Sequence, residues 1–194
     1  MQDHFYEASE ALVRSLKERY RDWDGVGQFE GTIERLCRLY DEFCWTPDHI
    51  RREAEKAFKV FEHSFEEMVV VGPTDVVILC PHHIMPCTLQ VIAGYIPNGD
   101  GKVLGLSKVC RIAEIMGKRP ILQEQYCQEL ANIIEQKLRP KGVAIYAVGT
   151  HGCMTFRGVK KRAKAITSIV RGDFKTEPET RHEFLELAQR LNKE

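Results

Sequence analysis

The sequence predicts an α+β fold in which a helical region precedes an antiparallel sheet that carries helices of its own. Apolar side chains recur at helical spacing over residues 3–21, 33–43 and 46–63. Beyond residue 66 the composition changes to short β-branched runs that follow one another without a crossover helix, which favours antiparallel pairing. Two helical stretches separate the early strands from the late ones. The expected order is therefore helices, then β-β-α-α-β-β, then a closing helix.

The helical region is expected over residues 1–65. Its first helix should stop at residues 22–27, where two glycines and two aspartates favour a turn. Its third helix should start at Thr46-Pro47, because Thr can cap a helix and Pro suits the first turn. The region could pack on a partner subunit or form a layer on the same core, and the sequence leaves both readings open.

The second region, residues 66–194, is expected to be one domain built around the sheet. Its strands are predicted over residues 68–71, 76–79, 88–96, 143–148, 153–159 and 165–170. Its helices are predicted over residues 104–116 and 121–138, and Thr180 is the expected cap of the helix that closes the chain.

The composition carries no global charge. Lysine plus arginine and aspartate plus glutamate number 28 each, so nothing favours nucleic acid or a membrane surface as partner, and an anion site must be local. No apolar run is long enough to span a bilayer, and the first residues lack the features of a signal peptide. The seven cysteines are an odd number, which favours reduced thiols over a disulfide framework. We therefore expect a cytoplasmic protein.

Cysteine and histidine gather in two short segments, Cys-Pro-His-His at residues 80–83 and His-Gly-Cys at residues 151–153. Cys80, His83 and Cys153 offer two thiols and one imidazole. Three protein ligands with one open position are how proteins hold catalytic zinc. His82 and His151 stand beside these ligands and could transfer protons at neutral pH. The alternative is a buried cysteine that only packs beside a core histidine, but the second segment favours the metal.

A group of cations suggests an anionic substrate. Lys108 and Arg111 follow a glycine and are three residues apart, so a helix presents both on one face near its N-terminus. Arg157 lies four residues beyond Cys153. Such cations could bind phosphate, although exposed lysine and arginine are usually only solvated.

Gln123 and Glu124 stand near the start of the helix predicted over residues 121–138. A carboxylate at this position interacts favourably with the helix dipole, and this role alone would explain it. Alternatively, Glu124 could accept two N–H donors from the edge of a guanine base.

Together these motifs resemble the GTP cyclohydrolase I family over residues 66–187. The matching segments come in the family's order: Glu67–Val71, Cys80–Pro86, Gly94–Pro97, Val103–Lys108, Arg111–Ile112, Arg119–Glu124, Thr150–Val159 and Thr180–Leu185. The resemblance implies a tunnelling fold, in which a β-β-α-α-β-β unit assembles into rings. The family is typically a homodecamer of two face-to-face pentamers, with active sites shared between subunits.

The resemblance also implies a role for each site residue. The zinc ligands would be Cys80, His83 and Cys153. The proton-transfer residues and the residue supporting the reacting end of the substrate would be His82, His151 and Ser107. The residues that bind the guanine and the triphosphate of GTP would be Gln123, Glu124, Lys108, Arg111 and Arg157.

The implied activity is the zinc-dependent conversion of GTP to 7,8-dihydroneopterin triphosphate and formate, a step of pterin and tetrahydrofolate biosynthesis. Activated water would attack C8 of the guanine while His151 protonates N7. Formate would leave by a second hydrolysis, and the ribose would open, rearrange and close into the pterin ring with His82 as a proton shuttle.

Three places differ from the family pattern. Pro81 stands where the family has Glu, His49 stands where it has Arg, and residues 163–165 read Ala-Lys-Ala where it has Ser-x-Thr. These differences leave two alternatives open. One is a homologue that acts on another purine nucleotide or stops at a ring-opened intermediate. The other is a non-catalytic, zinc-stabilised ring that binds nucleotide.

Overall fold

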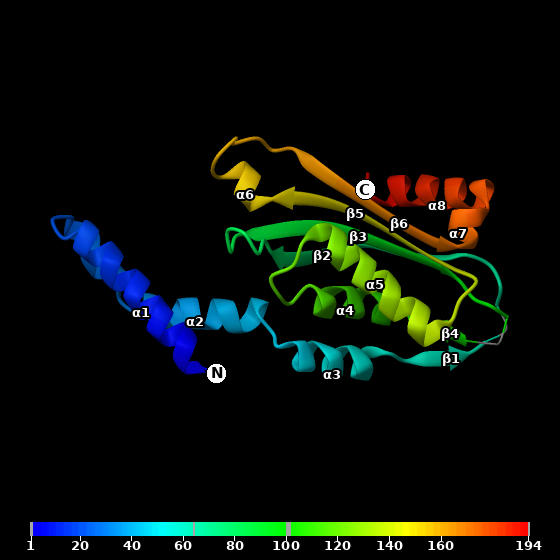
Figure 1. Ribbon diagram of the computed structural model, residues 1–194, viewed down its shortest axis with the longest axis horizontal. Helices are drawn as coiled ribbons and strands as arrows, with labels where there is room; N and C mark the ends of the chain where they lie inside the picture. The colour runs from blue at the N-terminus through cyan, green and yellow to red at the C-terminus, as the bar shows by residue number, and fades with distance from the viewer. Residues whose placement is uncertain (1, 64, 100–101, 194) are drawn as a thin grey trace. The chain divides into compact units, whose positions relative to one another are not determined.

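The computed structural model describes residues 2–63, 65–99 and 102–193 (Figure 1). The chain forms two compact units, Met1–Trp45 and Thr46–Glu194. Among the helices of the described residues, none is long and apolar enough to cross a membrane. The predicted boundary at residues 65/66 differs from this division because the third helix belongs to the second unit.

The first unit is a pair of packed helices, α1 (Gln2–Arg19) and α2 (Thr32–Phe43), joined by a 3₁₀ turn, η1 (Asp24–Phe29). The rings of Phe5 and Tyr40 stack across the pair with centroids 5.5 Å apart. Val13 of α1 is buried, whereas no residue of α2 is. The predicted helix, turn and second helix of this region are confirmed.

The second unit opens with α3 (Pro47–Ala57), which begins as predicted: the Thr46 side chain accepts a hydrogen bond from the backbone N–H of His49 at 3.2 Å. The prediction that this helix continues to residue 63 is wrong. Residues Val60–Glu62 form strand β1, which pairs antiparallel with β4 (Lys102–Leu104). This distant segment supplies the backbone partners that a helical pattern read locally does not anticipate.

The main sheet has four antiparallel strands in the order β2-β3-β5-β6 (Figure 1). The strands are β2 (Val69–Leu79), β3 (Pro86–Ile96), β5 (Gly142–His151) and β6 (Lys164–Gly172). The two short runs predicted at 68–71 and 76–79 are one strand. Its register with β3 shifts between Val71 and Thr74, where Pro73 cannot donate to the ladder.

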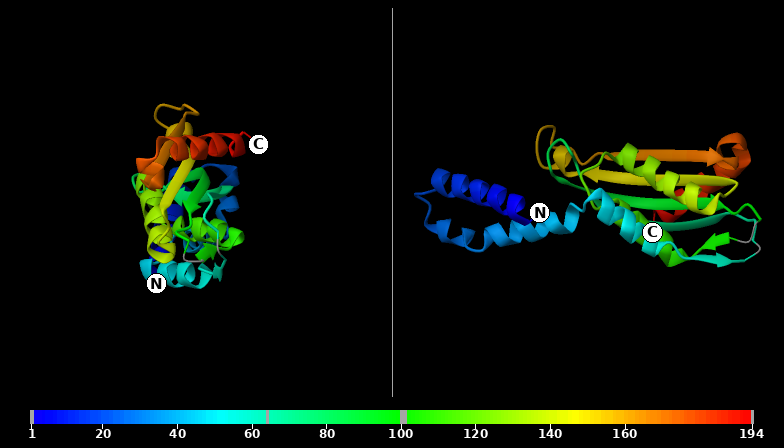
Figure 2. Two further views of the ribbon diagram at one scale, coloured as in Figure 1. Left: turned by 90° about the vertical axis from the view of Figure 1, so that its right-hand side faces the viewer. Right: turned by 60° about the horizontal axis from the view of Figure 1, so that its bottom comes forward.

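Helices cover both faces of this sheet. α4 (Leu106–Met116) and α5 (Gln123–Leu138) lie between β4 and β5 in sequence, and α5 packs on β5 and β6. The short α7 (Asp173–Thr176) and the closing α8 (Pro178–Leu191) place Phe174 and Phe184 on the opposite face, against Ile92 and Tyr146 (Figure 2). This arrangement confirms the α+β class and the antiparallel pairing.

Two further predictions are wrong. The segment 153–159 is not a strand, because Gly152–Thr155 forms the helical turn α6 and the following residues are a loop up to β6. Its apolar residues Met154, Phe156 and Val159 are exposed, so no buried face supports a strand here. Thr180 does not cap α8, because that helix begins at Pro178 with Glu177 as its N-cap residue.

Candidate metal centre

Cys80 follows the last residue of β2, and a tight turn brings His83 back to it. The backbone N–H of Cys80 donates to Met85 O at 2.9 Å, and the N–H of Ile84 donates to Cys80 O at 2.8 Å. Ile84 takes a left-handed conformation with φ 52°. As a result, Nδ1 of His83 lies 3.7 Å from Sγ of Cys80. The short Cys-x-x-His spacing therefore brings both side chains to one point, as expected.

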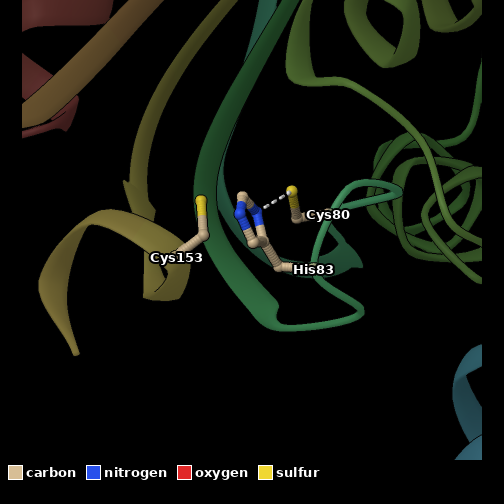
Figure 3. A group of neighbouring side chains, drawn as sticks. All are labelled: Cys80, His83 and Cys153. Carbon is tan, nitrogen blue, oxygen red and sulfur yellow. Dashed lines mark hydrogen bonds between the residues drawn. The ribbon is translucent and has the colours of Figure 1, made fainter. Parts of the chain in front are cut away.

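Cys153 reaches the same point from β5. Strand β5 runs beside β3, with His151 directly opposite Cys87. The chain then turns into α6 at Gly152, where a Cβ atom would lie 2.6 Å from Pro86 O, so only glycine allows this close approach. The ligand atoms of Cys80, His83 and Cys153 all lie within 4.8 Å of one another (Figure 3).

This donor set fits a metal ion. It combines two thiols with one imidazole, which suits soft and borderline metals. Cys80 is buried, Cys153 is half-buried and His83 is exposed, so the cluster is open on one side. Three protein ligands and an open side leave room for an additional ligand, as a metal that acts on a substrate requires.

A third thiol lies beside the cluster. The pKa of Cys87 is raised to about 11, mainly by burial and to a lesser extent by the nearby Cys153 and Cys80. Burial also raises the pKa of Cys153, with Cys80 as the next cause, while Arg157 opposes the shift. Sequence reasoning missed Cys87. Only the strand pairing reveals its position, opposite Ile78 near the end of β2 and opposite His151 at the end of β5.

Arg157 contacts the cluster through His83. Its Nη1 donates a hydrogen bond to Nε2 of the imidazole. Because a guanidinium can only donate, Nε2 is the acceptor, and the proton of the neutral ring is on Nδ1. A metal bound through Nδ1 requires the opposite tautomer, with the proton on Nε2. The Arg157 contact and metal binding through Nδ1 therefore exclude each other.

His151 contacts Gln123, the first residue of α5. Nε2 of His151 lies 2.8 Å from Oε1 of Gln123. The Gln123 side chain is 2 % exposed, and its amide nitrogen donates to Ala147 O and Ala165 O, at 3.2 Å each. Glu124, the next residue, is exposed in the first turn of α5. The backbone N–H of Ile121 donates to Leu79 O, which holds the start of α5 beside the end of β2.

The remaining predicted residues do not meet this cluster within one chain. Ser107 and Lys108 lie in the first turn of α4, directly after β4. The Tyr95 hydroxyl accepts a hydrogen bond from the Leu104 N–H, and Tyr95 pairs with Val69, at the end of the sheet away from Cys80. The start of α4, which follows β4, thus lies at the opposite end of the sheet from the turn after β2 that carries Cys80 (Figure 1).

Arg111 and His82 are both exposed. Arg111 is one helical turn beyond Lys108. The His82 ring is edge-on to that of His83, with centroids 6.3 Å apart. The structure therefore joins the three predicted ligands with His82, His151, Gln123 and Arg157, and separates them from Ser107 and Lys108.

Comparison with known proteins gives the family of this chain. The sequence profile described as GTP cyclohydrolase I matches residues 9–189. The chain belongs to the GTP cyclohydrolase I family. Relatives named GTP cyclohydrolase 1 include one from Rhodopirellula baltica, 39% identical over 184 residues, which covers 93% of this chain and 78% of the relative. The relative from Thermobifida fusca is 42% identical over 160 residues, covering 81% and 77%. The one from Pelotomaculum thermopropionicum is 39% identical over 180 residues, covering 92% and 94%.

Membership of the GTP cyclohydrolase I family extends to the helical N-terminal unit, because the profile match starts at residue 9. The family's members are hydrolases, and this chain carries the Cys-His-Cys group that could hold a metal for such chemistry. The motif-based resemblance covered only residues 66–187, so the comparison also assigns the first two helices to the GTP cyclohydrolase I family.

Proposed function

We propose that this protein is a zinc-dependent GTP cyclohydrolase I, which converts GTP to 7,8-dihydroneopterin triphosphate and formate. The carrying observation is the convergence of Cys80, His83 and Cys153 within 4.8 Å in a chain that belongs to this family. These three residues would hold the zinc ion. When bound, the ion supplies the Lewis acidity that activates water near neutral pH.

The histidines of the site would move protons. His151 is held by Gln123 and would protonate N7 of the guanine while water adds to C8. The bond from C8 to N9 then breaks, and a second hydrolysis releases formate. His82, exposed beside the cluster, would serve as the shuttle while the ribose opens, rearranges and closes into the pterin ring.

Substrate recognition would divide between the two ends of the sheet. Glu124, in the first turn of α5, would accept two N–H groups from the guanine edge. Arg157, which contacts His83, would bind the triphosphate. Lys108 and Arg111 would bind further phosphate oxygens, and Ser107 would support the reacting end of the substrate.

This division supports a site shared between copies of the chain. Ser107 and Lys108 lie at the opposite end of the sheet from Cys80, so one substrate would reach both sets only between two subunits. Strands β2 and β6 are the edges of the four-stranded sheet and could pair with other copies. We therefore propose the tunnelling fold and a homodecamer of two pentamers in the cytoplasm, with residues 66–194 as the catalytic domain and the mainly helical residues 1–65 preceding it.

The test is turnover of GTP. Purified protein loaded with zinc is incubated with GTP, and formate and the fluorescent oxidised pterin are measured. Both products are expected in equal amounts, and the Cys80→Ala variant should form neither. No product at high enzyme concentration would contradict the proposal.

A second candidate is a homologue that acts on another purine nucleotide or stops at a ring-opened product. It is favoured by Pro81, which is exposed within the turn of the metal cluster where the family has a carboxylate. Mass spectrometry of the products from a panel of purine nucleotides separates the two. Conversion of GTP alone, through to the pterin, rejects this candidate. A zinc-containing protein without turnover on any purine would instead support a ring that only binds nucleotide.

A further inference from the structure

The carboxamide of Gln123 is enclosed between α5, β5 and β6. It makes three hydrogen bonds: the amide nitrogen faces Ala147 O and Ala165 O, at 3.2 Å each, and the oxygen faces Nε2 of His151 at 2.8 Å. With 2 % of the residue exposed, this side chain has little surface left to offer a substrate.

The surroundings allow only one orientation of the amide. Ala147 O and Ala165 O are backbone carbonyls and can only accept, so the two N–H groups of Gln123 must face them. A flipped amide would set its oxygen against both carbonyls. The Gln123 oxygen therefore faces His151, and Nε2 of His151 must carry a proton to donate to it. In the neutral ring, Nδ1 is then the nitrogen without a proton.

Gly149 makes room for this arrangement. A Cβ atom at position 149 would lie 2.1 Å from Oε1 of Gln123 and 2.8 Å from Cδ2 of Leu89. Gly149 precedes His151 by two residues on β5, so both positions face the same side of the sheet. The absence of a side chain at Gly149 thus allows the Gln123 carboxamide to reach the His151 ring.

We infer that Gln123 is a positioning residue that fixes the ring orientation and tautomer of His151, rather than a group that binds guanine. This inference rests on the proposed function, in which His151 transfers a proton to the substrate. The contact with Gln123 keeps Nε2 hydrogen-bonded within the protein. Nδ1 is then the nitrogen that exchanges a proton with the substrate. A Gln123 that turned to bind guanine would lose its hydrogen bonds to Ala147 O and Ala165 O and would leave the His151 N–H without this acceptor.

The test uses two variants that remove the same contact by different routes. Gln123→Met keeps the approximate side-chain volume but removes all three hydrogen bonds. Gly149→Ala keeps Gln123 but occupies the position of its oxygen. Gln128→Leu, a change at an exposed residue of the same helix, is the matched control. Zinc content and circular dichroism establish that each variant is loaded and folded.

Steady-state kinetics with GTP then separate positioning from binding. Positioning predicts that both variants lose roughly 10- to 100-fold in kcat, as expected when a supporting hydrogen bond of a site histidine is removed. The KM should stay within about 2-fold, and the control should match the wild type. A raised KM with unchanged kcat would overturn the inference in favour of guanine binding. Unchanged kinetics in Gln123→Met would overturn it in favour of a purely structural role.

Solid-state NMR of the sedimented protein, with ¹⁵N-labelled histidine rings, reads the tautomer directly. The His151 signals are assigned by their loss in His151→Asn. The wild type should show His151 protonated at Nε2, and Gln123→Met should show a mixture of tautomers. The same tautomer in both proteins would overturn the inference. This measurement needs no turnover. If the wild type does not convert GTP, the proposed function is rejected, and the NMR spectra still test the contact between Gln123 and His151.

Discussion

Arg157 donates a hydrogen bond from Nη1 to Nε2 of His83, the imidazole whose Nδ1 lies 3.7 Å from Sγ of Cys80. This pair links the loop after α6 to the metal cluster. Metal binding through Nδ1 puts a proton on Nε2, which then repels the guanidinium instead of accepting from it. We therefore expect the cation to leave His83 when the site is loaded and to become available for an anion.

Replacing Arg157 should accordingly affect substrate binding more than metal binding. Arg157→Ala is expected to keep zinc and to raise the KM for GTP roughly 10-fold or more, because a charge-assisted hydrogen bond to phosphate is lost. Zinc content and steady-state kinetics measure both effects. Arg162→Ala, an exposed arginine of the same loop, is the control. Loss of zinc in Arg157→Ala would instead show that Arg157 supports His83 as a ligand.

Each proposed ligand should be needed for the metal. Cys80→Ala, His83→Ala and Cys153→Ala are expected to lose zinc and GTP turnover together, because two remaining ligands hold the ion weakly. Elemental analysis of the purified protein gives zinc per chain. Cys110→Ala changes a half-buried thiol of α4 outside the cluster and should keep both properties. A ligand variant that retains a full complement of zinc would remove that residue from the site.

Glu124 should determine recognition of guanine. Glu124→Gln is expected to lower kcat/KM for GTP by roughly 100-fold, since an amide presents an N–H towards the donors of the base. The control is Glu179→Gln, because Glu179 is also an acidic residue in the first turn of a helix and loses the same dipole interaction. Equal effects of the two changes would show that Glu124 only stabilises its helix.

The buried thiols should resist alkylation in the native protein. The pKa of Cys127 is raised to about 12, mainly by burial and to a lesser extent by the nearby Glu124. The thiolate is the reactive form, so burial lowers both the accessibility and the thiolate fraction of Cys127. Iodoacetamide labelling followed by peptide mass spectrometry should modify the half-buried Cys110 first and Cys127 only after unfolding. Equal labelling rates of Cys110 and Cys127 in the native protein would contradict the burial of Cys127.

Helix α8 should depend on one aromatic side chain. Phe184 is fully buried and packs edge-on against Phe174, with ring centroids 5.4 Å apart. Phe184→Ala is expected to lower the free energy of unfolding by about 3–5 kcal/mol, through lost burial and the cavity left behind. Urea denaturation at one fixed protein concentration measures the change. Leu122→Ala, at an exposed position, should lower the free energy of unfolding much less. A similar decrease in both variants would contradict the packing argument.

The sequence alone determined the features that depend on neighbouring residues. The cap at Thr46 and the return of His83 to Cys80 involve partners three residues apart, so the residue types and their spacing sufficed. The α+β class followed in the same way, because the helical and β-branched periodicities are local properties of the chain.

The tertiary structure decided everything that depends on which segments become neighbours. The segment 153–159 was predicted to be a strand, but these residues find no partner strand, and Cys153 reaches the cluster from a helical turn. The pairing of β3 with β5 brings Cys153 to Cys80, and the packing of α5 on β5 brings Gln123 to His151. The direction of α4 places Ser107 and Lys108 at the other end of the sheet. Such contacts join residues 28 or more positions apart, and no local spacing encodes them.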